Sequence, residues 1–232
     1  TLFDKNAKTE RELGCAADKI SIIPNGIHME RFAGISARAA HEGPLTLGAV
    51  VRIVPIKDII TMLRAFFLVQ QALPDAKLRI MGQYEEDPEY FALCQQTVST
   101  LKLTNVEFTG SVNVAEHLDD IDILLLSSIS EGQPLAVLEG MAARRPFVTT
   151  DVGCCQDLIY GRIGDDLGAA GEVVGPMDYE AMARAILKLA NHPEECRQMG
   201  EIGYERVNAY YTYEKFISSY QKIYKEALEM KD

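Results

Sequence analysis

The chain has 232 residues, a formal net charge of −11 and a hydrophobic content of 47%. This length is sufficient for one well-buried core, or for a core with a small appendage. The acidic balance argues against a general affinity for nucleic acid or anionic membranes, and no apolar run reaches the length of a transmembrane span.

Cysteine and histidine usage gives no sign of a disulfide framework or a metal site. The five cysteines are scattered, and two of them are adjacent at Cys154 and Cys155. The odd number and irregular spacing suit neither paired disulfides nor zinc ligation. Without a recognisable secretory signal, they predict a reduced, cytoplasmic environment. The four histidines lie far apart in the sequence, and we expect none of them to bind a metal or act as a base.

The N-terminal part of the chain predicts little regular structure. We expect a short polar helix over residues 5–13, stopped by Gly14, and a brief strand over residues 20–23. The strand ends at the turn Pro24-Asn25-Gly26. Residues 33–44 are small, polar and irregular, which is typical of a linker.

From residue 45 onward, short apolar runs alternate with helical patterns. We expect strands over residues 45–51, 77–81, 106–109, 121–126, 146–150 and 171–174. Between them, helices are expected over residues 58–73, 88–101 and 134–143, with a short helical piece near 114–119. This alternation predicts an α/β fold with a doubly wound, parallel, Rossmann-like sheet.

The C-terminal tail is predicted to be helical over residues 178–190, 193–209 and 213–229. In the last of these helices, apolar residues recur at helical spacing: Phe216, Ile217, Tyr220, Ile223 and Tyr224. We expect this stripe to pack in the core, and docking on a second lobe is the alternative.

Two glutamates mark the junction between the strand at residues 121–126 and the helix that follows it. Glu131 and Glu139 stand eight residues apart, and Pro134 fits the first helical position. Free N–H groups at a helix start favour anions, and a carboxylate is a good acceptor for vicinal hydroxyls. The spacing therefore suggests a diphosphate with a sugar at each end, although two solvated glutamates are the simpler alternative.

The phosphate-binding elements predicted for this chain are cationic side chains rather than a glycine-rich loop. The sequence contains no Gly-x-Gly-x-x-Gly fingerprint and no Walker lysine motif, which argues against a dinucleotide oxidoreductase. Arg52 and Lys57 instead follow the first strand, at the edge where open sheets bind ligands. Loops containing Gly82 and Val112 complete this rim, and backbone there could approach a flat base. A surface ion pair and an ordinary helix start remain alternative explanations of the two cations.

In this order, these segments resemble the C-terminal, donor-binding lobe of a retaining, two-lobed glycosyltransferase of family 4, the GT-B architecture. The resemblance spans almost the whole chain. Residues 23–27 with Arg31 and Phe32 are similar to the crossover from an N-terminal lobe, and Glu131 and Glu139 match the family's Glu-x7-Glu motif. A narrower resemblance, to cytosolic transferases that make exopolysaccharide, is found in residues 52–58, 86–90, 127–132 and 158–161.

The resemblance implies a role for each motif residue. Arg52 and Lys57 would neutralise the donor diphosphate and stabilise the departing nucleotide. Glu131 would bind hydroxyls of the transferred sugar, and Glu139 would bind the ribose diol. Arg52, Lys57 and Glu131 would thus form the catalytic set. The remaining donor-binding positions would be Gly82, Val112, Gly132, Gln133, Pro134 and Leu135. The donor would be UDP-glucose or a UDP-N-acetylhexosamine, with no metal and no other cofactor.

The same resemblance implies a division of the chain. Residues 1–30 would be a remnant of the N-terminal lobe and the crossover, residues 31–44 a linker, residues 45–212 the donor domain, and residues 213–232 a helix that packs on the absent lobe. The glycan acceptor would bind that lobe, so we expect the isolated chain to transfer little or no sugar. Membrane-bound exopolysaccharide secretion proteins are the further partners implied. A nucleotide-binding scaffold that has lost its chemistry is the alternative function.

Two departures from the family pattern affect expected stability more than donor binding. Arg144 and Arg145 stand where such sequences usually have a glycine, and we expect strain at this helix end. Cys154 and Cys155 are expected in the loop after the next strand.

Overall fold

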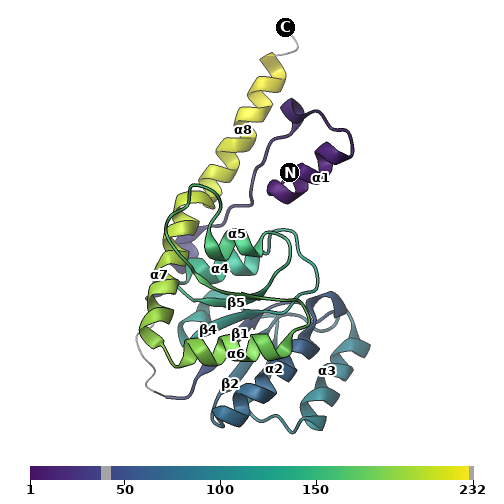
Figure 1. Cartoon of the computed structure of the whole chain (residues 1–232), viewed down its shortest axis with the longest axis vertical. Coiled ribbons are helices and arrows are strands. Elements are labelled where there is room, and N and C mark those ends of the chain that lie inside the picture. The colour runs from purple at the N-terminus through teal and green to yellow at the C-terminus, as the bar shows by residue number, and fades with distance from the viewer. Residues whose placement is uncertain (38–42, 230–232) are drawn as a thin grey trace.

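A six-stranded parallel sheet with strand order β3-β2-β1-β4-β5-β6 forms the centre of the molecule (Figure 1). The structure, a computed structural model, describes residues 1–37 and 43–229. The strands are β1 (Thr46–Val50), β2 (Lys77–Met81), β3 (Val106–Gly110), β4 (Ile123–Leu126), β5 (Phe147–Thr150) and β6 (Gly171–Val174). All five neighbouring pairs are parallel, which confirms the predicted doubly wound sheet.

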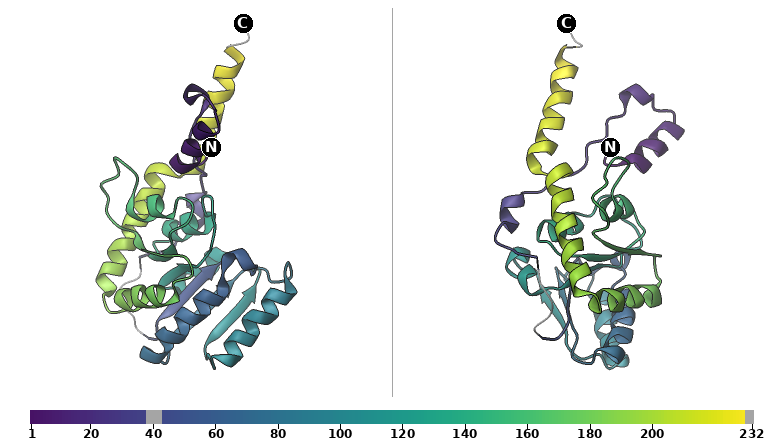
Figure 2. Two further views of the ribbon diagram at one scale, coloured as in Figure 1. Left: turned by 45° about the vertical axis from the view of Figure 1, so that its right-hand side comes forward. Right: turned by 60° about the vertical axis from the view of Figure 1, so that its left-hand side comes forward.

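Helices cover both faces of the sheet, and two 3-10 turns lie on the path to β4 (Figures 1 and 2). The helices are α1 (Asp4–Glu12), α2 (Ile59–Ala72), α3 (Pro88–Thr100), α4 (Leu135–Ala142), α5 (Cys155–Tyr160), α6 (Tyr179–Ala190), α7 (Pro193–Tyr210) and α8 (Tyr213–Glu229). The 3-10 turns are η1 (Ala17–Lys19), η2 (Met29–Phe32), η3 (Pro55–Lys57), η4 (Val114–Glu116) and η5 (Leu118–Asp120). None of the described helices combines the length and apolar character that crossing a bilayer requires.

The core is divided by the sheet into two clusters, and β4 contributes to both. Ile123 and Leu125 pack with α2 and α6, whereas Leu124 and Leu126 pack with α4 and α5. These four side chains are at most 3% exposed. Successive residues of a strand point to opposite faces, so a continuous apolar run is what a strand covered on both sides needs.

The N-terminal segment differs in part from its prediction. α1 lies away from the sheet, at the same end of the molecule as α8, and confirms the predicted helix (Figure 2). The strand predicted over residues 20–23 is wrong, because this stretch extends without a neighbouring strand to complete a ladder. Residues 38–42 of the predicted linker lie outside the described residues, whereas Phe32 and Ile35 are buried in the core.

Two predicted boundaries and one loop need correction. Pro134 is the N-cap of α4, with an extended ψ of 115°, rather than its first helical residue. The helical piece predicted near 114–119 is a pair of 3-10 turns, η4 and η5. Cys155 begins the short helix α5 instead of lying in a loop, with Cys154 as its N-cap. A six-residue helix gives too short a periodic pattern to be recognised from sequence.

The aromatic stripe of α8 is not part of the core. No described residue of α8 is buried, and Tyr220 and Tyr224 are 38% and 66% exposed. The predicted core packing is therefore wrong, because α8 leaves the sheet domain once Ile27 has paired with Thr212. Its rings contact one another instead, with 5.0 Å between the centroids of Phe216 and Tyr220. Docking of this face on another lobe stays a prediction.

The two arginines after α4 occupy well-defined positions. Arg144 has a φ of 55°, a conformation that favours glycine, in line with the expected strain. Its guanidinium lies 3.7 Å from the centroid of the Tyr204 ring, which offsets part of that cost. Arg145 is 1% exposed and donates to the carbonyls of Leu118 and Ser36 at 2.8 and 2.9 Å. Arg145 therefore ties the chain before β4 to the end of α4.

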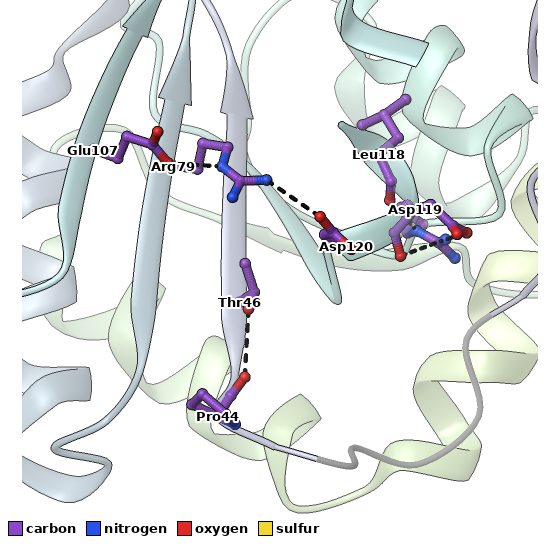
Figure 3. A network of polar contacts seen from close by, with 8 residues as sticks. Pro44, Thr46, Arg79, Glu107, Leu118, Asp119 and Asp120 are labelled. Atoms are coloured by element: carbon purple, nitrogen blue, oxygen red, sulfur yellow. Dashed lines mark hydrogen bonds and ion pairs between the residues drawn. The ribbon is translucent and has the colours of Figure 1, made fainter. Parts of the chain in front are cut away.

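Polar contacts secure the edge of the sheet at the amino ends of the strands (Figure 3). Arg79 on β2 donates to Glu107 on β3 at 2.9 Å and lies 3.9 Å from Asp120. Thr46 at the start of β1 donates its hydroxyl to the Pro44 carbonyl. Arg79 Nη1 is buried without a hydrogen-bond partner, so the network is not complete. Among the described residues, cavities lie at this edge, beside Thr46 and Lys77, as well as at the carboxyl ends of the strands.

Gly153 controls how closely the loop after β5 packs on the loop after β4. Its φ is 56°, and an added Cβ would collide with the backbone of Glu131 and Gly132. We predict that Gly153→Ala destabilises the protein by about 2–4 kcal/mol, since a left-handed conformation and overpacking each carry a cost. Urea unfolding provides the measurement.

Gly164→Ala is the matched control, because Gly164 also has a positive φ, 90°, but nothing lies within 4 Å of the added Cβ. It should cost only about 1–2 kcal/mol. Equal destabilisation by the two substitutions would show that the contact with residues 131 and 132 is unimportant.

Candidate functional site

A cavity of about 480 Å³ lies at the carboxyl ends of β1, β2 and β4. In a sheet of this topology, the crevice forms where the strand order reverses, here between β1 and β4. The residues lining the cavity are Val50, Val51, Arg52, Lys57, Met81, Gly82, Ser111, Val112, Val114, Leu126, Glu131, Gln133, Pro134, Leu135, Ala136 and Glu139.

The fold brings the predicted site residues together at this cavity, with one exception. Nine of them line it: Arg52, Lys57, Gly82, Val112, Glu131, Gln133, Pro134, Leu135 and Glu139. Gly132 is not among the lining residues, and its carbonyl accepts a hydrogen bond from Cys154 N at 3.1 Å. Gly132 therefore joins two loops behind the cavity rather than facing it.

Lys57 and Glu131 form the shortest ion pair within the cavity. Lys57 Nζ lies 2.6 Å from Glu131 Oε1, with side chains only 17% and 10% exposed. Ser128 Oγ donates to the same oxygen at 2.6 Å. The carboxylate thus receives two hydrogen bonds, which compensate its removal from water.

The loop that carries Lys57 is held by its own local structure. Pro55 begins the turn η3, and Asp58 adopts a left-handed conformation with φ of 47°. The Asp58 side chain accepts from Thr61 N at 3.2 Å and caps α2. Asp tolerates this backbone conformation better than most residues, so one residue both turns the chain and starts the helix.

Hydrogen bonds to backbone carbonyls then tie this loop to the loop after β4, and that loop to β5. Ser127 Oγ donates to the Lys57 carbonyl at 2.9 Å, and Ile129 N donates to the Ile56 carbonyl at 2.9 Å. Thr150 on β5 donates its hydroxyl to the Ser128 carbonyl at 2.7 Å. The positions of Lys57 and Glu131 are therefore fixed before any ligand arrives.

Arg52 is held more loosely, at the mouth of the cavity. One guanidinium nitrogen donates to both carboxylate oxygens of Glu86, at 2.7 and 2.8 Å. The hydrogen bonds from Arg52 and then Gln83 hold the pKa of Glu86 below its ordinary value. Since the side chains of Arg52 and Glu86 are 53% and 42% exposed, solvent screens this pair and Arg52 can exchange its partner at little cost.

The N-terminus of α4 faces the same space. Leu135 and Ala136, the first residues of this helix, line the cavity together with the cap Pro134. The N–H groups of a first helical turn have no intrahelical partner and attract anions. Gln133 is anchored beside them, because its Oε1 accepts from Asn25 N at 2.6 Å.

Glu139 lies further along α4 and is the less exposed partner of an ion pair. Its side chain is 22% exposed, and Arg31 lies 3.4 Å from its Oε1. Burial raises the pKa of the Glu139 carboxyl, and the charge of Arg31 partly offsets that rise. A carboxylate held this way is suited to accept hydrogen bonds from hydroxyl groups.

The wall on the β2 and β3 side is small and mainly apolar. Gly82 has a φ of 153°, and a Cβ there would collide with the Val51 carbonyl oxygen. With Ser111 and Val112 beside it, this wall offers backbone groups and flat apolar surface. The cavity thus combines cations and a helix start, a carboxylate, and an apolar wall.

The cysteines near the site have a packing role in the structure. All five are free, and burial raises the pKa of Cys155 to about 11. Cys154 and Cys155 lie behind the Glu131 loop and are at most 4% exposed. A thiol that is neutral and enclosed is a poor nucleophile, so we assign neither a chemical function.

Sequence reasoning missed several contacts that complete the site. Ser128 had a local signal, because a hydroxyl three residues before a glutamate is placed to contact it in a turn. Glu86 and Arg31 had none, since they lie 34 and 108 residues from Arg52 and Glu139. Such partners are chosen by tertiary proximity.

Curated proteins similar to this chain include a synthase and a glycosyltransferase of amylovoran biosynthesis. It is 30% identical over 174 residues to N-acetyl-alpha-D-glucosaminyl L-malate synthase of Bacillus anthracis, covering 75% of this chain and 43% of that protein. It is 26% identical to the amylovoran biosynthesis glycosyltransferase AmsK of Erwinia amylovora, covering 77% and 44%. The chain thus spans less than half the length of these relatives.

Solved structures share the fold over nearly the whole chain. Sucrose-phosphate synthase from Thermosynechococcus elongatus superposes with a TM-score of 0.80 at 21% identity, covering 99% of this chain and 58% of that one. Anabaena HepE in complex with UDP and glucose superposes with a TM-score of 0.76 at 15% identity, covering 95% and 60%. At these identities the likeness establishes the fold, that of GT-B glycosyltransferase C-terminal domains.

The family assignment comes from the sequence itself. Residues 44–192, more than half of the chain, match the family described as glycosyl transferases group 1. This match contains β1 to β6 and every residue that lines the cavity. The chain therefore belongs to the group 1 glycosyl transferases.

Proposed function

We propose that the cavity binds a nucleoside diphosphate sugar with UDP as its nucleotide, and that the chain is the donor-binding part of a retaining hexosyltransferase of family 4. The composition of the cavity carries this proposal. Arg52, Lys57 and the start of α4 face the same space as Glu139. Anionic phosphate suits the first three, and a ribose diol suits the carboxylate.

Relatives support the choice of donor and of pathway. HepE holds UDP and glucose in its structure, and AmsK takes part in amylovoran biosynthesis. From the resemblance carried by residues 52–58, 86–90, 127–132 and 158–161, we further propose that the whole protein is a cytosolic transferase that makes the Pel exopolysaccharide. We propose UDP-glucose or a UDP-N-acetylhexosamine as donor, with transfer to an exopolysaccharide in the cytoplasm.

In the proposed mechanism, the chain's own charges stabilise the leaving nucleotide. The diphosphate lies between Lys57, Arg52 and the N–H groups at residues 133–135. As the bond between the sugar and the diphosphate breaks, negative charge develops on the departing diphosphate. Lys57 and the N–H groups are already in place to stabilise it, and Arg52 joins them by exchanging Glu86 for phosphate when the donor binds. Glu131 binds hydroxyls of the transferred sugar while its Oε1 keeps Lys57 in place. The proposal needs no metal, because the two side chains supply the positive charge.

The acceptor is proposed to bind in the part of the relatives that this chain does not cover. The chain spans 43% of the N-acetyl-alpha-D-glucosaminyl L-malate synthase and 44% of AmsK. We therefore expect little or no sugar transfer by the 232-residue chain alone. Membrane-bound secretion proteins are the proposed partners of the whole enzyme. A nucleotide-binding module without chemistry is the alternative, and it predicts the same ligand but no transfer by the whole protein.

Calorimetric titration with UDP, GDP and ADP tests the donor assignment. We expect selective UDP binding that Lys57→Ala and Glu139→Ala each weaken by about ten- to a hundredfold, since each removes a charged hydrogen bond to the ligand.

Lys222→Ala is the control, because this lysine is 78% exposed on α8 and far from the cavity. Thermal unfolding of each variant separates lost binding from lost folding. UDP binding that both cavity variants leave unchanged, or no binding to the wild type, would contradict the proposal.

Neutralising the acid that holds Arg52 should strengthen donor binding. In Glu86→Gln, Arg52 no longer leaves a charged partner when it turns to the phosphate, so we expect UDP to bind about two- to fivefold more tightly. Glu85→Gln serves as control, since Glu85 accepts from Tyr84 N instead of Arg52. Weaker binding by Glu86→Gln would show that Glu86 orients Arg52 toward the ligand.

A further inference from the structure

Residues 25–31, which lead into and include most of η2, contact α4 and the residue before its N-cap. Asn25 N donates to Gln133 Oε1 at 2.6 Å, just before α4 begins. Six residues later, Arg31 lies 3.4 Å from Glu139 Oε1 in the second turn of the helix. One short segment, remote in sequence, therefore touches both the phosphate-binding end of the cavity and the carboxylate assigned to the ribose.

This segment is anchored on both sides of Arg31's position. Ile27 N donates to the Tyr211 carbonyl, and Tyr213 N donates to the Ile27 carbonyl, both at 2.9 Å. Phe32 is 1% exposed and anchors η2 in the core. The Arg31 guanidinium also lies 5.5 Å from the centroid of the Phe32 ring. Although 51% of the Arg31 side chain is exposed, its backbone is fixed beside α4.

The charges around Glu139 single out Arg31. Across the described residues, the ion pair that includes Glu139 is the one with Arg31. The other charged groups that line the cavity are Arg52, Lys57 and Glu131, and both cations are engaged by other acids. Burial raises the pKa of Glu139, and Arg31 is the charge that opposes this rise.

We propose that Arg31 is a positioning residue that holds Glu139 Oε1, so that Oε2 accepts the two hydroxyls of the ligand's ribose. This inference rests on the proposed nucleotide-binding function. It makes η2, which contains Arg31, part of the donor site, although η2 lies outside the sheet. Arg31 acts through Glu139, so its contribution requires both a carboxylate at position 139 and hydroxyls on the sugar.

The test uses the full chain, calorimetry and two ligands, UDP and 2′,3′-dideoxyuridine 5′-diphosphate. Arg31→Gln should weaken UDP binding about three- to tenfold at pH 7, and Arg31→Lys should recover part of that loss. The loss should disappear with the dideoxy ligand and in a Glu139→Gln background. Arg184→Gln, on α6 with a side chain 69% exposed, is the matched control.

The pH dependence of UDP affinity provides a second test, because it would stay the same if Arg31 had only a structural role. Without Arg31, the pKa of Glu139 rises further, so Glu139 becomes protonated at a higher pH as the solution is acidified. Between pH 8 and pH 5, UDP affinity should therefore begin to fall at a higher pH in Arg31→Gln than in wild type. The diphosphate itself titrates in the same way with both proteins, so its contribution cancels when wild type and Arg31→Gln are compared.

The outcomes separate this inference from the proposed function. Wild-type protein that binds no UDP would overturn both. If wild type binds UDP and Arg31→Gln binds it equally well at every pH, only the role of Arg31 is overturned. An equal loss with the dideoxy ligand, or full additivity with Glu139→Gln, would likewise show that Arg31 does not act through Glu139.

Discussion

The geometry of the cavity depends on the ion pair between Lys57 and Glu131. This pair joins the loop after β1 to the loop after β4, the two strands between which the sheet reverses its winding. Largely buried charges are costly unless their hydrogen bonds are satisfied, and Ser128 Oγ donates to the Glu131 carboxylate. Ser127 Oγ donates to the backbone carbonyl of Lys57 and so holds the two loops together. The contact therefore closes the floor of the crevice and fixes a cation where α4 begins.

The pairing also explains how so acidic a chain can offer a site for an anion. Lys57 is paired with Glu131 and Arg52 with Glu86, so the site is compensated before ligand arrives. Binding a diphosphate then means exchanging partners at Arg52, adding a second anion at Lys57, and using the free N–H groups of α4. Such a site favours a ligand that carries hydroxyls as well as phosphate, because phosphate alone must compete with glutamates already in place.

The regular part of the fold could be predicted because each strand or helix has a local pattern long enough to read. The apolar run of β4 and the helical periods of α2 and α6 are examples. The strand predicted over residues 20–23 and the packing of α8 failed, since each depends on a neighbour that no local pattern reveals. The same limit applies to the site. Its motif residues follow strand ends, whereas Glu86 and Arg31 reach it only through tertiary contacts.

The central claim is that this crevice holds a nucleoside diphosphate in one defined orientation. A crystal structure of the chain with UDP tests it most directly. We expect the diphosphate between Lys57, Arg52 and the start of α4, the ribose hydroxyls on Glu139, and the base against Gly82 and Val112. UDP bound elsewhere, or bound here with its ribose turned away from Glu139, would contradict it.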